Sequence, residues 1–178
     1  MAQRPQSIRN VSWAVVRDGT ERRHAYRRNV DILLKDGKVA EIAPAGSRPG
    51  GPGEETIDGS GMLALPGLIN VHSHPSTEPG YRGVREDHGV PEQQMTGLME
   101  RLQAFRLPDE GRVPAATMAY SEMLRCGTTT ACDITVPFDG WLETMARSGM
   151  RFYAAPTFAS ARWGMSAPQT VKIGRAHV

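Results

Sequence analysis

The sequence predicts an α/β fold in two parts, strands alone over residues 1–66 and alternating strands and helices over residues 67–171. The first part consists of short apolar runs separated by turn residues, a pattern typical of a small β-sandwich. In the second part the order β-α-β-α-β predicts parallel strands joined by right-handed crossovers. The chain has 178 residues, whereas a complete (β/α)8 TIM barrel takes about 250 residues. The order of the elements therefore fits about three strands of such a barrel and not a complete one.

Composition indicates a globular protein, with 39% hydrophobic and 22% charged residues and a net charge of +2. That charge favours neither nucleic acid nor an acidic membrane. No apolar run approaches the roughly 18 residues of a membrane span, and the N-terminus lacks the apolar core of a signal peptide. Cys126 and Cys132, without CxxC spacing, are expected to be buried thiols. The sequence thus predicts a cytoplasmic protein and leaves homo-oligomer formation open.

The first part is expected to begin with a half-buried strand over residues 8–16, where Val11, Trp13 and Val15 alternate with other residues. Two strand-like runs, 31–34 and 39–42, flank Asp36-Gly37, and Asp-Gly between such runs is a strong hairpin signal. The proline- and glycine-rich segment 44–53 is expected to be an exposed loop. Two short strands, over 56–58 and 62–65, complete the predicted part of the sandwich.

A basic cluster lies near the first predicted turn, at Arg22, Arg23, His24, Arg27 and Arg28. It would serve either as an anion-binding patch or as the solvated end of a hairpin. The solvated hairpin end is favoured, because no aromatic or glycine-rich partner accompanies the cluster in the sequence.

The second part is organised around a pair of histidines at the end of an apolar run. Leu68–Val71 is expected to form a buried strand, bounded by Pro66-Gly67 and by Pro75. Residues two apart on a strand share a face, so His72 and His74 can converge on one metal ion at about 2.0–2.1 Å. The end of a parallel strand is also where a barrel keeps its chemistry. The alternative is a pair of ordinary strand histidines, one of them facing solvent.

The stretch Pro66-Gly67-Leu68-Ile69-Asn70-Val71-His72-Ser73-His74 resembles the first-strand signature of the amidohydrolase superfamily. The resemblance is closest to its cytosine-deaminase-like and chlorohydrolase-like (TRZ/ATZ) branch. Arg82-Gly83 stands at about the offset where that branch often carries an Arg-Gly pair. Leu124-Arg125-Cys126-Gly127-Thr128-Thr129-Thr130 is similar to its junction between a helix and the second strand. The resemblance runs from about residue 31 to about residue 163.

The resemblance implies a metal-dependent hydrolase that uses a metal-activated water on C–N bonds, as in deamination, or on C–Cl bonds of a nitrogen heterocycle. It implies one divalent ion, zinc with iron as the alternative, held by His72 and His74. Further ligands and the catalytic proton shuttle are expected beyond Val171, so the 178-residue chain is predicted to be an inactive N-terminal piece. Two alternatives stay open: a noncatalytic relative, and a cupin-like binding barrel suggested by the HxHxxxE spacing to Glu78.

The segment from Pro75 to Val90 follows the predicted metal ligands and is expected to wall the substrate pocket. Glu78 and Arg82 are the candidates for contact with a small heterocyclic substrate, although most residues of such a loop are merely solvated. His88 is a candidate third ligand or proton shuttle. Asp133, near the end of a later strand, would reach the metal, orient a ligand or serve as a hydrogen-bonded structural carboxylate; the structural role is favoured.

The remaining elements alternate as a barrel requires. Helices are predicted from Pro91 to Phe105, over 113–125 and over 140–148, and strands over 128–134 and 151–156. The side chains expected to be buried in the second and third helices are Ala116, Ala119, Tyr120, Met123, Leu124, Trp141, Leu142 and Met145.

Residues 172–178 are expected to be an artefact. Ile173 to Val178 corresponds to the translation of a common sequencing-adapter read, ATC GGA AGA GCA CAC GTC. We therefore exclude this tail, including His177, from the fold and the site. The predicted domains are residues 1–66, 67–171 and this tail.

Overall fold

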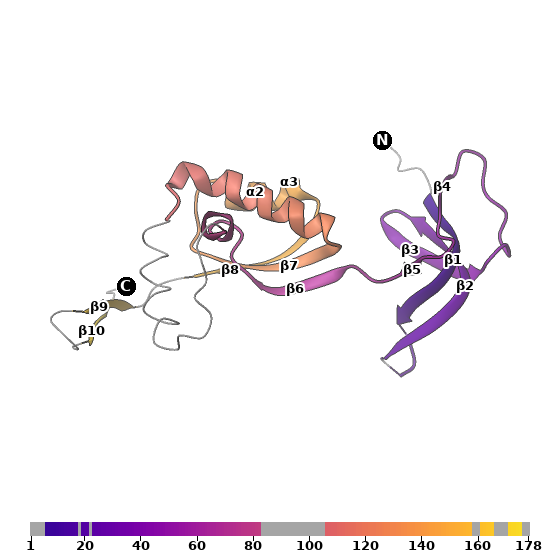
Figure 1. The fold of residues 1–178 in the computed structure, drawn as a ribbon, viewed down its shortest axis with the longest axis horizontal. Coiled ribbons are helices and arrows are strands. Elements are labelled where there is room, and N and C mark those ends of the chain that lie inside the picture. The colour runs from indigo at the N-terminus through magenta and orange to yellow at the C-terminus, as the bar shows by residue number, and fades with distance from the viewer. Residues whose placement is uncertain are drawn as a thin grey trace. The chain divides into compact units, whose positions relative to one another are not determined.

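The structure is a computed structural model, and it describes residues 6–17, 19–21, 23–82, 106–157, 161–165 and 171–175. The chain divides into two compact units, Met1–Pro66 and Gly67–Val178 (Figure 1). The predicted helix over 91–105 and the candidate ligand His88 lie outside the described residues.

The first unit contains one sheet of five strands. Its strand order is β3-β2-β1-β4, and β5 also pairs with β1. The first three strands are antiparallel, whereas β4 and β5 run parallel to β1. The strands are β1 (Gln6–Arg17), β2 (His24–Lys35), β3 (Lys38–Pro44), β4 (Glu55–Asp58) and β5 (Leu63–Ala64).

The hairpin between β2 and β3 turns at Asp36 and Gly37, as predicted. Both residues have positive φ, 51° and 71°, which a tight turn matching the strand twist requires. Glycine adopts this conformation without steric cost, and aspartate tolerates it better than most residues.

Asp31 is a buried carboxylate at the centre of this unit. It accepts hydrogen bonds from the main-chain amides of Asn10 (2.9 Å) and Gly46 (3.0 Å) and from Nη1 of Arg9 (3.1 Å). Burial alone would raise the pKa of Asp31, but these three bonds outweigh it and hold the pKa below its ordinary value. The carboxylate thus ties the bulge of β1 to the loop after β3.

The basic cluster has an aromatic partner that the sequence did not reveal. Trp13 pairs in register with Arg28, and the Arg28 guanidinium lies 4.4 Å from the centre of the indole ring. The expectation that no aromatic residue accompanies the cluster was therefore wrong. Arg27 and Arg28 also lie within β2 and not at the hairpin end. Stacking on Trp13 gives Arg28 a structural role.

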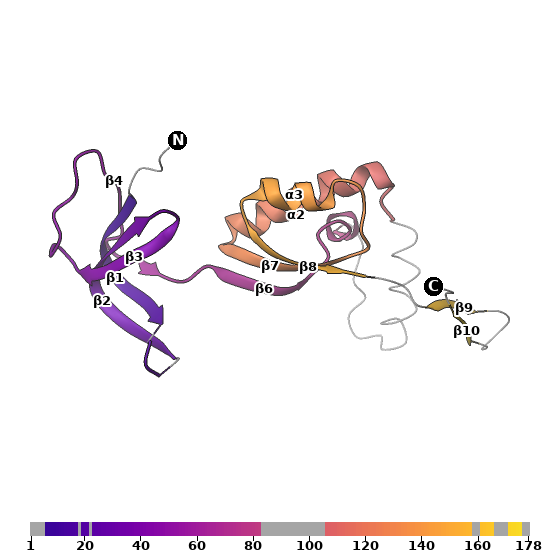
Figure 2. The ribbon, with the colours of Figure 1, turned by 180° about the vertical axis from the view of Figure 1, so that it is seen from behind.

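The second unit carries a parallel sheet of order β6-β7-β8. Figures 1 and 2 show α2 and α3 together on one face of that sheet. A separate antiparallel pair, β9 and β10, includes the first residues of the tail at 172–178, whose origin stays a prediction. The elements are β6 (Leu68–Ser73), the 3-10 helix η1 (Glu78–Tyr81), α2 (Asp109–Arg125), β7 (Thr128–Thr135), α3 (Trp141–Ser148), β8 (Arg151–Pro156), β9 (Ala161–Met165) and β10 (Val171–Arg175).

The core of this unit fills the space between the two helices and the sheet. Its buried side chains are Ala116, Tyr120, Trp141 and Met145, with Phe138, Met150 and Phe152 packed against them. Three of the expected core residues lie outside it: Leu142 is 59% exposed, Leu124 is 40% exposed and Met123 is only half-buried. The second helix begins at Asp109, four residues before the predicted start, and contains Pro114.

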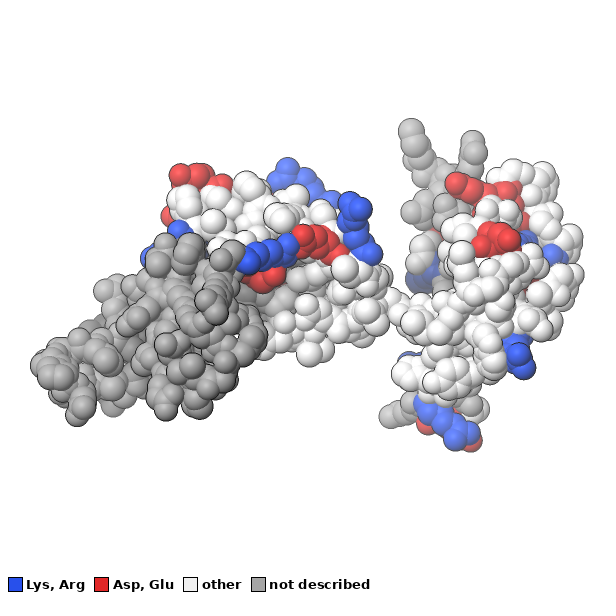
Figure 3. All heavy atoms as spheres, in the orientation of Figure 1, with Lys and Arg blue, Asp and Glu red and all other residues white. Residues whose placement is uncertain are grey.

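The strand β6 was predicted to be buried, and in the structure it is exposed. Leu68, Ile69 and Val71 are 55%, 66% and 77% exposed. The physical reason is its position, since among the described strands β6 pairs only with β7. Figure 3 shows an uncharged surface over β6, below the charged side chains of the helices.

Candidate metal centre

His72 lies near the end of β6, where the strand carries a bulge, and His74 follows its last residue, Ser73. Asn70 pairs with Ala131 and Ser73 pairs with Asp133, so β6 holds one residue more than β7 in this interval. A bulge bends the strand and re-aims its side chains. The side-chain oxygen Oδ1 of Asn70 accepts a hydrogen bond from the His72 amide at 3.1 Å, which satisfies a main-chain donor within the bulge.

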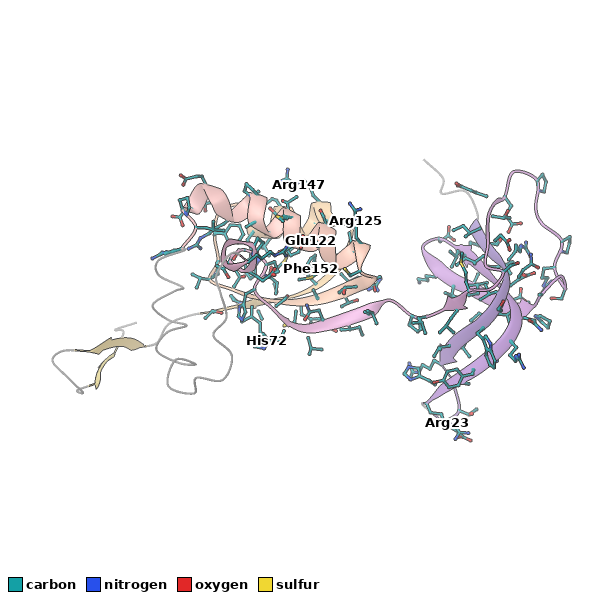
Figure 4. The ribbon with its side chains drawn as sticks, viewed as in Figure 1. Arg23, His72, Glu122, Arg125, Arg147 and Phe152 are labelled. Carbon is teal, nitrogen blue, oxygen red and sulfur yellow. The ribbon has the colours of Figure 1, made fainter. Side chains whose placement is uncertain are left out.

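The two imidazoles converge as the sequence predicts. Their Nε2 atoms lie 3.0 Å apart, and their ring planes meet at 75°. Two nitrogens at this separation, each about 2.05 Å from one ion, would subtend about 94° at it, which zinc coordination accommodates. Figure 4 shows His72 on the side of the sheet away from α2, whereas Phe152 lies on the helix side.

The hydrogen bond of His74 to the next strand orients its ring. Nδ1 of His74 lies 2.6 Å from the main-chain oxygen of Ile134, which can only accept, so Nδ1 carries the proton. Nε2 is then left with its lone pair, the tautomer that a metal ligand needs. Ser73 points to β7 and donates from Oγ to the Cys132 carbonyl at 2.7 Å.

The described residues provide two ligands and not a complete site. Within the described ranges, His, Cys, Asp and Glu side chains form no group of three or more that could hold an ion. Catalytic zinc sites generally use three protein ligands. The histidine pair therefore fits part of a metal centre.

A cavity of about 420 Å³ brings the candidate site residues together. It is lined by His72 and His74 at the end of β6, by Glu78 and Arg82 at η1, and by Glu122 on α2. Cys126 also lines it and is exposed, and Cys132 is half-buried, so the expectation of two buried thiols was wrong. Both predicted metal ligands thus share one cavity with both predicted substrate contacts.

Arg82 is held by two carboxylates. Its Nε and Nη2 atoms each donate to Glu78, both at 3.1 Å, and Nη1 donates to Glu122 on α2 at 2.5 Å. Glu122 first and Glu78 second raise the pKa of the Arg82 guanidinium, and Arg82 lowers the pKa of Glu122. This network fastens η1 to α2, and contact of Glu78 or Arg82 with a substrate stays a prediction.

Asp133 lies on the helix side of the sheet, so its favoured structural role agrees with the structure. It is fully buried, and its Oδ2 accepts bonds from Tyr120 Oη (2.5 Å) and Trp141 Nε1 (3.0 Å). Burial first, and then the bond to Asp133, raise the pKa of Tyr120. Within the part of the chain that the structure describes, Oδ1 of Asp133 has no hydrogen-bond partner.

Two groups of known enzymes resemble the chain. A 5-methylthioadenosine/S-adenosylhomocysteine deaminase from Desulforudis audaxviator is 32% identical over 128 residues, covering 68% of this chain. A 5'-deoxyadenosine deaminase from Methanocaldococcus jannaschii is 34% identical over a span of the same length and coverage. The crystal structure of atrazine chlorohydrolase TrzN from Arthrobacter aurescens TC1, complexed with zinc, matches 83% of the chain with a TM-score of 0.65 and 24% identity.

The chain belongs to the amidohydrolase superfamily. None of the protein-family models compared with the sequence matches it. The chain spans 28% of the length of each of these two deaminases and 34% of the chlorohydrolase. The amidohydrolase-type α/β fold therefore accounts for the described elements, and the activity of the whole protein is a matter for proposal.

Sequence reasoning missed the groups that support the two histidines. Asn70 bonds the His72 amide, Ile134 offers its carbonyl to His74, and Glu122 holds Arg82. Glu122 and Arg82 are 40 residues apart, and no local pattern connects them. The alternation of side chains along β7 does indicate that Asp133 and Ile134 face opposite sides of the sheet.

Proposed function

We propose that the whole protein is a metal-dependent hydrolase that acts on C–N bonds, as in deamination, or on C–Cl bonds of a nitrogen heterocycle. The observation that carries the proposal is the pair of Nε2 atoms 3.0 Å apart at the end of a parallel strand. The relatives named for deamination of adenosine derivatives and the chlorohydrolase named for atrazine support this reaction class.

The fold that we propose for the whole protein contains a (β/α)8 barrel of which β6, β7 and β8 are the first three strands. The five-stranded sheet of the first unit is then part of a small β-sandwich. Three parallel strands with helices on one face support this proposal, as does the match to the chlorohydrolase structure.

The metal that we propose is zinc, with iron as the alternative, held in part by His72 and His74. The zinc in the chlorohydrolase structure supports this choice. When bound, such an ion activates water and polarises the group under attack. Asn70 and Ile134 hold the backbone and ring of the two ligands, while the remaining ligands and the catalytic groups are expected beyond Val171.

The substrate that we propose is a small nitrogen heterocycle bound beside the histidine pair. Glu78 and Arg82 are the proposed contacts, because both line the cavity that His72 and His74 line. We propose that the protein is cytoplasmic and has no nucleic-acid or membrane partner. A homo-oligomer stays open. None of the helices in the described ranges has the length and hydropathy of a membrane-crossing segment.

A cupin-like binding barrel, the alternative from another class of protein, conflicts with the sheet. Cupins are antiparallel and nearly all-β, whereas β6, β7 and β8 are parallel and α2 and α3 cover them. A noncatalytic relative that keeps the scaffold remains the competing proposal.

The test is to sequence the gene through codon 171 and onward and to assay the whole protein. We expect the frame to supply further histidines and an aspartate at strand ends. With zinc, the protein should release ammonia from adenosine-type substrates or chloride from chlorotriazines, and His74→Ala should abolish the release. A frame without such ligands, or a zinc-loaded protein inactive on both panels, would favour the noncatalytic relative.

A further inference from the structure

We propose that Asp133 and Tyr120 are positioning residues for the ligand His74, although neither side chain contacts it. The proposal rests on the proposed metal site and explains how its geometry is kept. It connects the buried bond from Tyr120 to Asp133 with the bond that His74 makes to Ile134.

The orientation of His74 depends on a main-chain atom. Its Nδ1 donates to the Ile134 oxygen at 2.6 Å, and this bond selects the tautomer whose Nε2 faces His72. A carbonyl oxygen cannot rotate as a side chain does. The backbone at the end of β7 therefore determines where this acceptor lies.

Asp133 fixes that end of β7 from the helix side. It precedes Ile134 directly, so the two side chains leave opposite faces of the strand. Its Oδ2 receives Oη of Tyr120 from α2 and Nε1 of Trp141 from α3, so two helices bind one carboxylate oxygen. The anchor and the acceptor are thus consecutive residues on opposite sides of one sheet.

The bonds from the two helices both reach the same oxygen of Asp133. Oδ1 of Asp133 is buried, and no described residue bonds to it. An apolar residue at this position could accept neither of the two bonds. Pairing with β8 holds β7 within the sheet. That pairing does not fix β7 relative to α2 and α3.

The test reads the tautomer of His74 directly, without metal or activity. Long-range 1H–15N spectra of the metal-free whole protein at pH 8 distinguish a proton on Nδ1 from one on Nε2. We expect Nδ1–H for His74 in the wild type and a mixture of tautomers in Tyr120→Phe, which keeps the ring and loses the donor. Tyr26→Phe, which alters an exposed ring in the other unit, is the matched control and should leave the spectrum unchanged.

Zinc affinity and a conservative rescue complete the test. Mutation of outer-shell partners of metal ligands typically costs 10–100-fold in affinity, so Tyr120→Phe should weaken zinc binding by the whole protein about tenfold. Asp133→Ala should weaken it as much, and Asp133→Asn, whose amide oxygen still accepts, should recover part of the loss. Should Asp133→Ala fail to fold, Tyr120→Phe still decides the matter.

A purely structural role gives a different result. If Tyr120→Phe lowers the melting temperature and leaves both the His74 tautomer and the zinc affinity at wild-type values, the positioning proposal is wrong. If instead the tautomer responds as expected and the whole protein binds no zinc, the positioning stands and the proposed metal site fails.

Discussion

Gly67 lies against Thr129 so closely that no larger residue fits at the start of β6. A Cβ built on Gly67 would lie 2.7 Å from the Cβ of Thr129 and closer still to its Oγ1 and Cγ2 atoms. Thr129 is in turn held by Arg151, whose Nη2 donates to its Oγ1 at 2.9 Å. Just before β6, the backbone of Gly67 therefore packs directly against the side chain of Thr129, which a residue with a side chain could not do.

Gly67→Ala should consequently destabilise the second unit. Forcing one extra carbon into such a contact costs about 1–3 kcal/mol, because the strand or Thr129 must shift. The free energy of unfolding, measured with urea, is the check. Gly19→Ala is the control, since nothing lies within 4 Å of a Cβ at that position; equal stability of the two variants would contradict the prediction.

The buried Asp31 makes the first unit sensitive to acid. Its folded pKa lies below the ordinary 3.8, so its contribution to stability is present above about pH 4 and is lost as the pH falls through the folded pKa. Asp31→Asn should cost about 1–3 kcal/mol at pH 7, because the donors around this buried position lose an ionised acceptor, although Arg9 keeps its bonds to Glu54.

The difference between the wild type and Asp31→Asn should shrink on acidification. The free energies of unfolding of both proteins at pH 7, 5 and 3 measure this difference. The comparison uses the unfolding transition of the first unit at each pH. Glu41→Gln, which alters an exposed pair with Arg48, supplies the comparison at each pH. A difference that stays constant from pH 7 to pH 3 would show that Asp31 is not ionised in the folded protein.

Two neighbouring positions in α3 test the core of the second unit. Met145 is 6% exposed and Leu142 is 59% exposed. Met145→Ala should therefore cost about 2–4 kcal/mol, whereas Leu142→Ala should cost less than about 0.5 kcal/mol. Thermal unfolding of the two variants is the measurement. A larger loss for Leu142→Ala would mean that α3 presents its other face to the sheet.

The link between η1 and α2 should be weak and sensitive to salt. Arg82 and Glu122 are partly exposed, and water screens such a pair, so its contribution to stability should be small. A double-mutant cycle with Arg82→Gln and Glu122→Gln measures their coupling. It should decrease in 1 M salt; a coupling that is zero at low salt would contradict the contact.

Much of the fold follows from local sequence patterns. The Asp36-Gly37 hairpin, the strand that carries the histidines and the left-handed glycines after α2 and α3 are all set by residues close to one another in sequence. The convergence of His72 and His74 likewise follows from strand alternation. The bulge between Asn70 and Ser73 could not be predicted from that alternation.

The errors concern contacts between distant parts of the chain. Leu142 belongs to an apolar pattern, yet which side of a short helix faces the sheet depends on how α2 and α3 pack. Pro114 removes one helical hydrogen bond and did not prevent α2 from beginning at Asp109. The stacking of Arg28 on Trp13 depends on the register of β1 and β2, which the sequence of either strand alone does not define.

The central claim is that His72 and His74 bind one metal ion, and zinc affinity tests it most directly. Competition with a chelating dye gives the dissociation constants for the whole protein and for its His72→Ala, His74→Ala and His24→Ala variants, the last removing an exposed histidine from the first unit. We predict that either site variant weakens zinc binding at least tenfold, while His24→Ala binds as the wild type does. Equal zinc affinity in all four proteins would contradict the claim.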